Sequence, residues 1–229
     1  MATSSVVREA HHQAFAGPCA ELVEHAGLGV TISVGAGCTI VIEGDPIEHV
    51  YRILSGTVRL YNAVPDGRRQ IIDFLGAAAC FGLMDLDEHA YSVEAITDVV
   101  MVRYQRHRLE ALIEEHPELS HQLFRLACAE LKRAQQRMLL LGRKSAEERV
   151  ASFLLDLARQ QHAGDGDELH LAMSRQDIAD HLGLTIETVS RIFTRFKAAG
   201  LIRLPDRHAV RLSDIDRLAH VADCDLATG

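Results

Sequence analysis

The 229-residue sequence predicts an α+β fold in which an N-terminal antiparallel barrel or jelly roll precedes one long helix and a helical unit that ends in a hairpin. Three observations predict it: valine- and isoleucine-rich runs interrupted by turn residues, an unbroken helical stretch near the middle, and two short capped helices near the C-terminus. Hydrophobic residues make up 48% of the chain and charged residues 24%, which excludes a disordered or collagen-like protein. The length allows one or two compact domains.

Short apolar runs fill residues 31–104 and predict antiparallel strands with tight turns. Residues 50–54 and 57–61 are expected to be two strands joined at Ser55-Gly56. A short helix is expected before the barrel, at residues 18–26. Glycine, proline and aspartate mark the turns between the runs, at Gly35, Gly37, Gly44-Asp45-Pro46, Ser55-Gly56, Pro65-Asp66-Gly67 and Gly76.

A long helix is predicted from Pro117 to Leu141, because proline is tolerated in a first turn and nothing breaks the following 24 residues. Apolar residues at alternating steps of three and four make the seam of a two-stranded coiled coil: Phe124, Ala127, Leu131, Ala134, Met138 and Leu141. A second stripe of Leu119, Leu123 and Leu126 is placed to pack on the barrel. A helix buried once within its own domain explains one stripe but poorly explains both, so we predict a dimer helix.

A new helix is predicted after Gly142, which ends the long one. Ser145 and Glu148 form a capping box, in which each side chain accepts a hydrogen bond from the other residue's backbone amide. This helix is expected to run to about Gln160. Residues 142–144 are therefore the predicted domain boundary.

Two short helices joined by a tight turn follow. Ser174 caps the first helix and Gly183 closes it, while Thr185 caps the second helix, residues 186–199. Residues expected to face the core are Ile178, Ala179, Leu182, Val189, Ile192, Phe193 and Phe196, and those expected to face outward are Glu187, Thr188, Ser190, Arg191 and Arg195. A hairpin around Pro205-Asp206-Arg207-His208 completes a winged helix-turn-helix. A generic three-helix packing unit is the alternative.

Charge is distributed unevenly along the chain. The net charge is −8, yet residues 173–211 carry seven arginines or lysines against four acidic residues. A locally basic module on an acidic chain favours a nucleic-acid partner, although a solvated surface explains the same excess.

The stretch MSRQDIADHLGLTIETVSRIFTRFKAAGLI resembles the DNA-binding helix-turn-helix of the Crp/Fnr regulator superfamily, in its Fnr and FixK branch. The likeness rests on Glu187-x-x-Ser190-Arg191 and covers nearly the whole chain. It implies a cyclic-nucleotide-binding-like β-roll at 1–116, a dimerisation helix at 117–142 and a winged helix-turn-helix at 143–229. It also implies a cytoplasmic homodimeric transcriptional regulator, in the main an activator, that works with RNA polymerase in microoxic, anaerobic or nitrogen-related gene control.

The resemblance assigns roles to residues of the second helix. Arg191 and Glu187 are expected to read bases, since a guanidinium donates two hydrogen bonds to guanine and a carboxylate accepts one from cytosine. Ser190 is the third readout position, and Ile186 is placed to touch a thymine methyl. The target implied is an inverted repeat with TTG and CAA ends. Phosphate contacts are expected from Ser174, Arg175, Gln176, Thr188 and Arg195.

The β-roll lacks the residues of known sensor chemistry. Cyclic-nucleotide sites of this superfamily follow Gly-Glu with an arginine, whereas Gly82 precedes Leu83 and residues 71–102 contain no lysine or arginine. Five cysteines at irregular spacing fit no iron–sulfur site, so buried structural cysteines are expected. The thirteen histidines form no metal motif and are expected on the surface. We predict no cofactor and effector-independent action.

Two alternatives stay open: a haem- or ligand-sensing regulator of the same superfamily, and an enzyme or small-molecule receptor that uses the barrel. No nucleophile, base and orienting group share a motif, which disfavours an enzyme. No apolar run is long enough to span a membrane, and the first 17 residues do not resemble a secretory signal, so the expected location is the cytosol.

Overall fold

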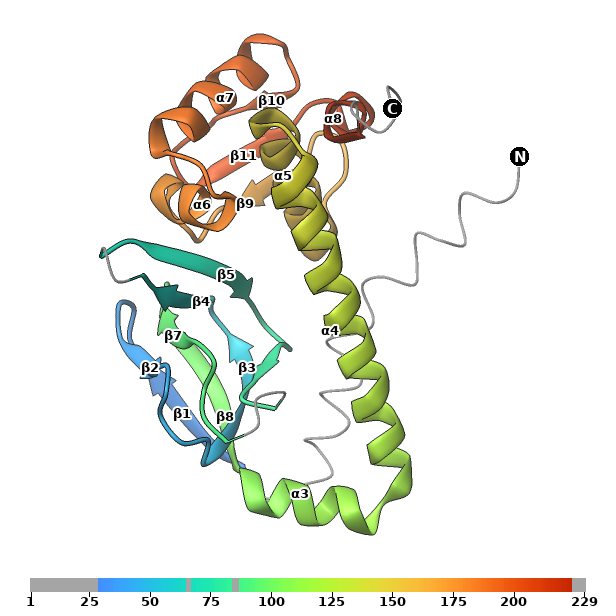
Figure 1. Cartoon of the computed structure of the whole chain (residues 1–229). Helices are drawn as coiled ribbons and strands as arrows, with labels where there is room; N and C mark the ends of the chain where they lie inside the picture. Colours follow the sequence, from blue (N-terminus) through green and yellow to red (C-terminus); the bar gives the residue numbers. More distant parts are fainter. Residues whose placement is uncertain (1–28, 65–66, 84–86, 224–229) are drawn as a thin grey trace, which may run out of the picture. The chain divides into compact units, whose positions relative to one another are not determined.

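The computed structural model describes residues 29–64, 67–83 and 87–223, and the short helix expected at 18–26 lies outside them. The chain divides into two compact units, residues 1–133 and 134–229. The division falls inside a single helix, α4 (Pro117–Arg143), which runs two residues past the predicted Leu141. The predicted three-part division therefore stays a prediction, while the α+β class and the order of the parts are confirmed (Figure 1).

Two four-stranded antiparallel sheets form the N-terminal roll. One sheet has the order β1-β8-β3-β6 and the other β2-β7-β4-β5. The first sheet comprises β1 (Val30–Val34), β8 (Val99–Gln105), β3 (His49–Ser55) and β6 (Cys80–Phe81). The second comprises β2 (Thr39–Val41), β7 (Ser92–Ala95), β4 (Val58–Ala63) and β5 (Arg69–Leu75).

The strands predicted on either side of Ser55-Gly56 exist as β3 and β4, but they belong to different sheets. Gly56 has φ +91°, and a Cβ there would lie 2.3 Å from the Asp98 carbonyl oxygen. Only glycine allows the chain to turn this closely against β8. The turn is therefore a corner between the two sheets, and it does not close a hairpin.

The core of the roll lies between the two sheets. Ile53, Val58, Val93 and Met101 are completely buried there, one from each of β3, β4, β7 and β8. In β3, β4 and β8 these residues alternate with exposed or half-buried neighbours, as strands with one buried face require.

A helix that the sequence analysis did not predict, α3 (Arg106–Glu115), follows β8 and buries Leu109. Leu119 of α4 packs with Leu109 and Val50, and Leu126 packs with Cys80 and Tyr104. Half-buried Leu123 joins both clusters. The second apolar stripe of the long helix therefore packs on the roll, as predicted.

The C-terminal unit contains the predicted helix-turn-helix and hairpin. Its helices are α5 (Ala146–Gln160), α6 (Arg175–Leu182), α7 (Ile186–Ala198) and α8 (Ile215–Asp223). A three-stranded sheet has the order β10-β11-β9, with β9 (Glu168–His170), β10 (Ile202–Arg203) and β11 (Ala209–Leu212). Strand β9 and helix α8 were not predicted from the sequence; they pack on the unit through Leu169 and Leu218, both fully buried.

Candidate nucleic-acid interface

Helix α7 is strongly two-sided, and its polar face is the candidate interface. Val189, Ile192, Phe193 and Phe196 are at most 4% exposed and hold the helix against the unit's core. The opposite face carries the residues predicted to read bases, all of which are exposed: Ile186, Glu187, Ser190 and Arg191. Packing therefore fixes the helix while its polar side chains point to solvent.

The first turn of α7 is organised by its N-cap. Thr185 Oγ1 accepts a hydrogen bond from the Thr188 amide at 3.2 Å, and the two threonine hydroxyls lie 3.1 Å apart. The carboxylate of Glu187 accepts hydrogen bonds from its own backbone N–H and from the Thr185 hydroxyl. Together with nearby Arg191, these bonds lower the pKa of Glu187 below its ordinary value, so the residue is ionised at neutral pH.

Arg191 is oriented by one weak contact along the helix. Its Nη2 donates to Thr188 Oγ1 at 3.4 Å. The guanidinium thus projects from the same face of the helix as Glu187, one turn further along, with donors left over for a ligand. An adjacent acceptor and bidentate donor are the groups that distinguish base edges in a major groove.

Helix α6 begins with a capping box that uses the Ser174 side chain. Ser174 Oγ accepts from the Asp177 amide at 3.1 Å and donates to Asp177 Oδ2 at 2.7 Å. Gln176 Nε2 donates to Asp180 Oδ1 at 2.6 Å. The single hydroxyl hydrogen of Ser174 is thus engaged within the helix, whereas Gln176 keeps a second side-chain N–H for a phosphate.

Arg175 lies against the core of the unit. Its guanidinium carbon is 3.7 Å from the centroid of the Phe193 ring, a cation–π contact between α6 and α7. Burial lowers the pKa of Arg175 to about 10. Its predicted phosphate contact stays a prediction, because the structure directs this guanidinium toward Phe193.

Arg195, the remaining phosphate candidate of α7, forms an ion pair with Glu147 at the start of α5. The Arg195 side chain is 70% exposed, so the pair is a solvated one of small energy. A phosphate group would compete with Glu147 for this arginine.

The hairpin adds cations that the sequence analysis counted but did not assign to the site. Arg203 and Arg207 are exposed on β10 and its turn, and the described residues offer them no ion-pair partner. Arg211 on β11 lies 3.5 Å from Glu168. The local excess of basic residues was the signal that could have assigned them.

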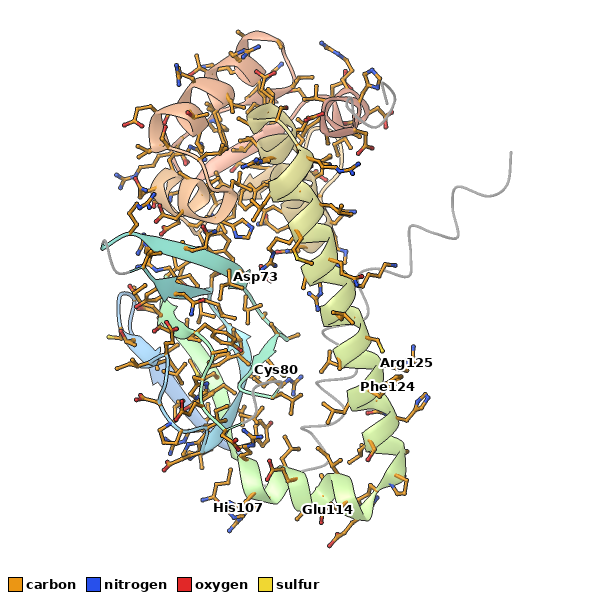
Figure 2. The ribbon with its side chains drawn as sticks, viewed as in Figure 1. Asp73, Cys80, His107, Glu114, Phe124 and Arg125 are labelled. Carbon is orange, nitrogen blue, oxygen red and sulfur yellow. The ribbon has the colours of Figure 1, made fainter. Side chains whose placement is uncertain are left out.

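The roll packs on α4 through apolar side chains after β6. Leu83 contacts both apolar clusters that include Leu123, and Cys80 lies between the roll and α4 (Figure 2). Cys80 is buried, but Cys38 and Cys128 are exposed free thiols, so the expectation of buried cysteines is wrong for these two. Cys38 lies between a turn and β2, and Cys128 lies on an exposed face of α4.

No three His, Cys, Asp or Glu side chains within residues 29–64, 67–83 and 87–223 are grouped to hold a metal ion. None of the helices in these same ranges has both the length and the apolar character needed to cross a membrane.

Both units of the chain match known protein families. A cyclic nucleotide-binding domain model matches residues 31–116, and a Crp-like helix-turn-helix domain model matches residues 148–221. The nitrogen fixation regulation protein FixK of Azorhizobium caulinodans is 45% identical over 192 residues, which cover 82% of this chain and 77% of that protein. FixK of Bradyrhizobium diazoefficiens is 42% identical over 187 residues, covering 81% and 79%.

A solved structure agrees with these relatives. FixK2 from Bradyrhizobium japonicum superimposes with a TM-score of 0.80 at 35% identity, covering 85% of this chain and 97% of that one. A CooA mutant from Carboxydothermus hydrogenoformans, at 22% identity and a TM-score of 0.73, shares the fold.

A β-roll, a long helix and a winged helix-turn-helix with an exposed polar recognition helix define a DNA-binding transcriptional regulator. The matched domains and relatives narrow this class: the chain belongs to the Crp/Fnr superfamily, as a FixK-like regulator. The relatives of this chain are transcriptional regulators and not enzymes, and the chain is a regulator of the same family.

Proposed function

We propose that the chain is a cytoplasmic, homodimeric transcriptional activator that binds an inverted repeat with TTG and CAA ends and acts with RNA polymerase without a small-molecule effector. FixK is by name a nitrogen fixation regulation protein, and AadR of Rhodopseudomonas palustris, 41% identical, is a transcriptional activatory protein. We therefore place the target genes in microoxic, anaerobic or nitrogen-related metabolism. The observation that carries the proposal is the exposed Glu187, Ser190 and Arg191 face on a rigidly packed α7.

The base readout follows from the chemistry of that face. Ionised Glu187 accepts a hydrogen bond from a cytosine amino group, and Arg191 donates two to a guanine. Ser190 contributes a hydroxyl between them, and Ile186, 37% exposed, supplies a methyl-sized apolar contact for thymine. The guanine of the TTG end and the cytosine paired with it in the complementary CAA supply the two bases that these contacts require.

The dimer is supported by an apolar stripe that stays exposed among the described residues of the chain. Phe124, Leu131 and Met138 are 66%, 61% and 67% exposed, at the spacing of one heptad. Ala127 and Ala134 lie between them and are also exposed, which leaves room for close approach of a second helix. A second copy of α4 covers the whole stripe.

Effector-independent binding is supported by the composition of the roll. No lysine or arginine occurs in residues 71–102, so a cyclic phosphate would meet no cation there. Leu83, the residue after Gly82, packs with leucines of α4. Leu83 thus makes an apolar contact at the position where binding of a cyclic phosphate requires a cationic side chain.

The test compares two arginines of α7 that have different proposed roles. Arg191→Ala removes a bidentate donor and is expected to cost ~1 to 3 kcal/mol per half-site while relaxing preference at one base position. Arg195→Ala removes a phosphate contact and is expected to weaken all sequences alike and to flatten the salt dependence.

Competition binding against every single-base variant of the inverted repeat, at two salt concentrations, distinguishes the two effects. A site selected from random DNA by the wild-type protein supplies the reference. If Arg191→Ala lowered affinity evenly across all variants, the assignment of Glu187, Ser190 and Arg191 to base readout would be wrong.

A further inference from the structure

Arg149, in the first turns of α5, donates hydrogen bonds to three backbone carbonyl groups. Nη2 donates to Leu141 O at 2.8 Å, Nε to Lys144 O at 2.9 Å and Nη1 to Leu182 O at 3.0 Å. No carboxylate of the described residues forms an ion pair with it. Its charge is therefore directed at main-chain oxygens.

The three carbonyl groups belong to two helix ends. Leu141 lies in the last turn of α4 and Lys144 directly follows that helix, while Leu182 is the last residue of α6. The last carbonyls of a helix have no partner within it and carry its partial negative charge. One guanidinium thus donates a hydrogen bond to an end carbonyl of each helix and places its positive charge at both C-termini.

The turn of the helix-turn-helix is built against this arginine. Gly183 has φ +64°, and a Cβ built there would lie 3.7 Å from Arg149 Nη1 and 4.0 Å from Leu141 Cδ2. Arg149 therefore links the end of α4 to the start of the turn into α7 through its hydrogen bonds to Leu141 and Leu182. A lysine in place of Arg149 has no planar fork and does not reach three carbonyls in different directions.

We infer that Arg149 is a positioning residue for DNA binding, which sets the orientation of the recognition helix relative to the C-terminal part of the seam, Ala134, Met138 and Leu141. The inference rests on the proposed homodimer, in which that seam defines the two-fold axis. Two recognition helices must then enter successive major grooves at a fixed separation. A loose joint would leave each half-site contact intact and would disturb only their simultaneous engagement.

Comparing the affinity for a full inverted repeat with the affinity for one half-site distinguishes a positioning role of Arg149 from a direct DNA contact or a general loss of stability. The probes are a duplex with the full inverted repeat, a duplex with one half-site, and repeats lengthened or shortened by one base pair. The variants are Arg149→Met, which removes every donor but keeps an unbranched stem, and Arg149→Lys. Arg159→Met is the matched control, because Arg159 lies on the same helix and pairs only locally with Asp156.

Arg149→Met is expected to reduce the ratio of full-site to half-site affinity roughly tenfold and to flatten the preference for half-site spacing. Affinity for the half-site and the salt dependence are expected to stay unchanged, and Arg159→Met is expected to match wild type throughout. Arg149→Lys is expected to lie between the two, and its ratio decides the question if Arg149→Met does not fold.

If Arg149→Met left the ratio of full-site to half-site affinity unchanged, including by an equal loss of affinity for both, the inference would be overturned. A wild-type protein with no preference for the inverted repeat over a half-site would overturn the proposed function and, with it, the inference. A wild-type preference together with an unchanged ratio in the variants overturns only the role of Arg149.

Discussion

Replacing Leu131 with lysine tests the proposed dimer at the middle of its seam. In the chain alone Leu131 is 61% exposed, so lysine at this position should leave the fold of each chain intact. In a dimer the same residue meets its symmetry mate near the two-fold axis. The substitution is therefore expected to act on association and not on folding.

The size of the effect follows from exposure and charge. Full burial of a leucine side chain contributes ~1.5 to 3 kcal/mol, so the exposed three-fifths of two copies are worth about 2 to 4 kcal/mol. Two ammonium groups about 6 Å apart, at an effective dielectric constant of about 20, repel by about 3 kcal/mol. The sum, about 5 to 7 kcal/mol, weakens the dimer by roughly four to five orders of magnitude.

Sedimentation at micromolar protein measures this directly, and monomer is the expected result for Leu131→Lys. Leu139→Lys is the matched control, because Leu139 is equally exposed, at 61%, on the same helix but lies outside the seam. It is expected to remain a dimer, and circular dichroism checks that both variants fold. A dimer of unchanged affinity in Leu131→Lys would refute the assigned seam.

Three further predictions concern the roll and the helix-turn-helix. Sub-millimolar cAMP is expected to leave promoter affinity unchanged, and a gain of more than about tenfold in binding assays would reveal a phosphate clamp in the roll. Ser174→Ala is expected to lower the free energy of unfolding by ~1 kcal/mol in urea titrations, because it removes the cap of α6. Unchanged stability together with weaker DNA binding would instead favour a phosphate contact. The pKa of Glu187 is lower in the folded state than its ordinary value of 4.5, so the ionised carboxylate stabilises the fold at pH values above 4.5. This stabilisation is lost as the pH falls through the lower pKa of the folded state. The difference in urea midpoint between wild type and Glu187→Gln should therefore be present at pH 7 and vanish in acid, and a difference independent of pH would contradict the assigned hydrogen bonds.

Local sequence signals predicted the helix-turn-helix of the C-terminal unit closely. The caps at Ser145, Ser174 and Thr185 and the closing Gly183 appear in the structure where the sequence placed them. Each depends on residues within about one turn of helix, so the stretch of sequence contains all the partners. The buried face of α7 was predictable for the same reason, since a period of 3.6 residues defines it.

Contacts between residues far apart in the chain required the tertiary structure. The strands flanking Gly56 look like a hairpin in sequence, but their partners lie elsewhere: β3 pairs with β8 and β6, and β4 with β7 and β5. Strand β9 is three residues long and is stabilised by its pairing with β11, some forty positions later. Neither arrangement leaves a local pattern.

The same distinction applies to the arginines. Composition identified a basic segment, and a motif singled out Arg191 and Glu187 as base-reading candidates on an exposed face. Only the folded unit pairs Arg195 with Glu147, stacks Arg175 on Phe193 and directs Arg149 to the ends of two helices. A long cationic side chain reaches any acceptor that the fold brings within range, so the residue type determines its charge and the tertiary structure determines its partner.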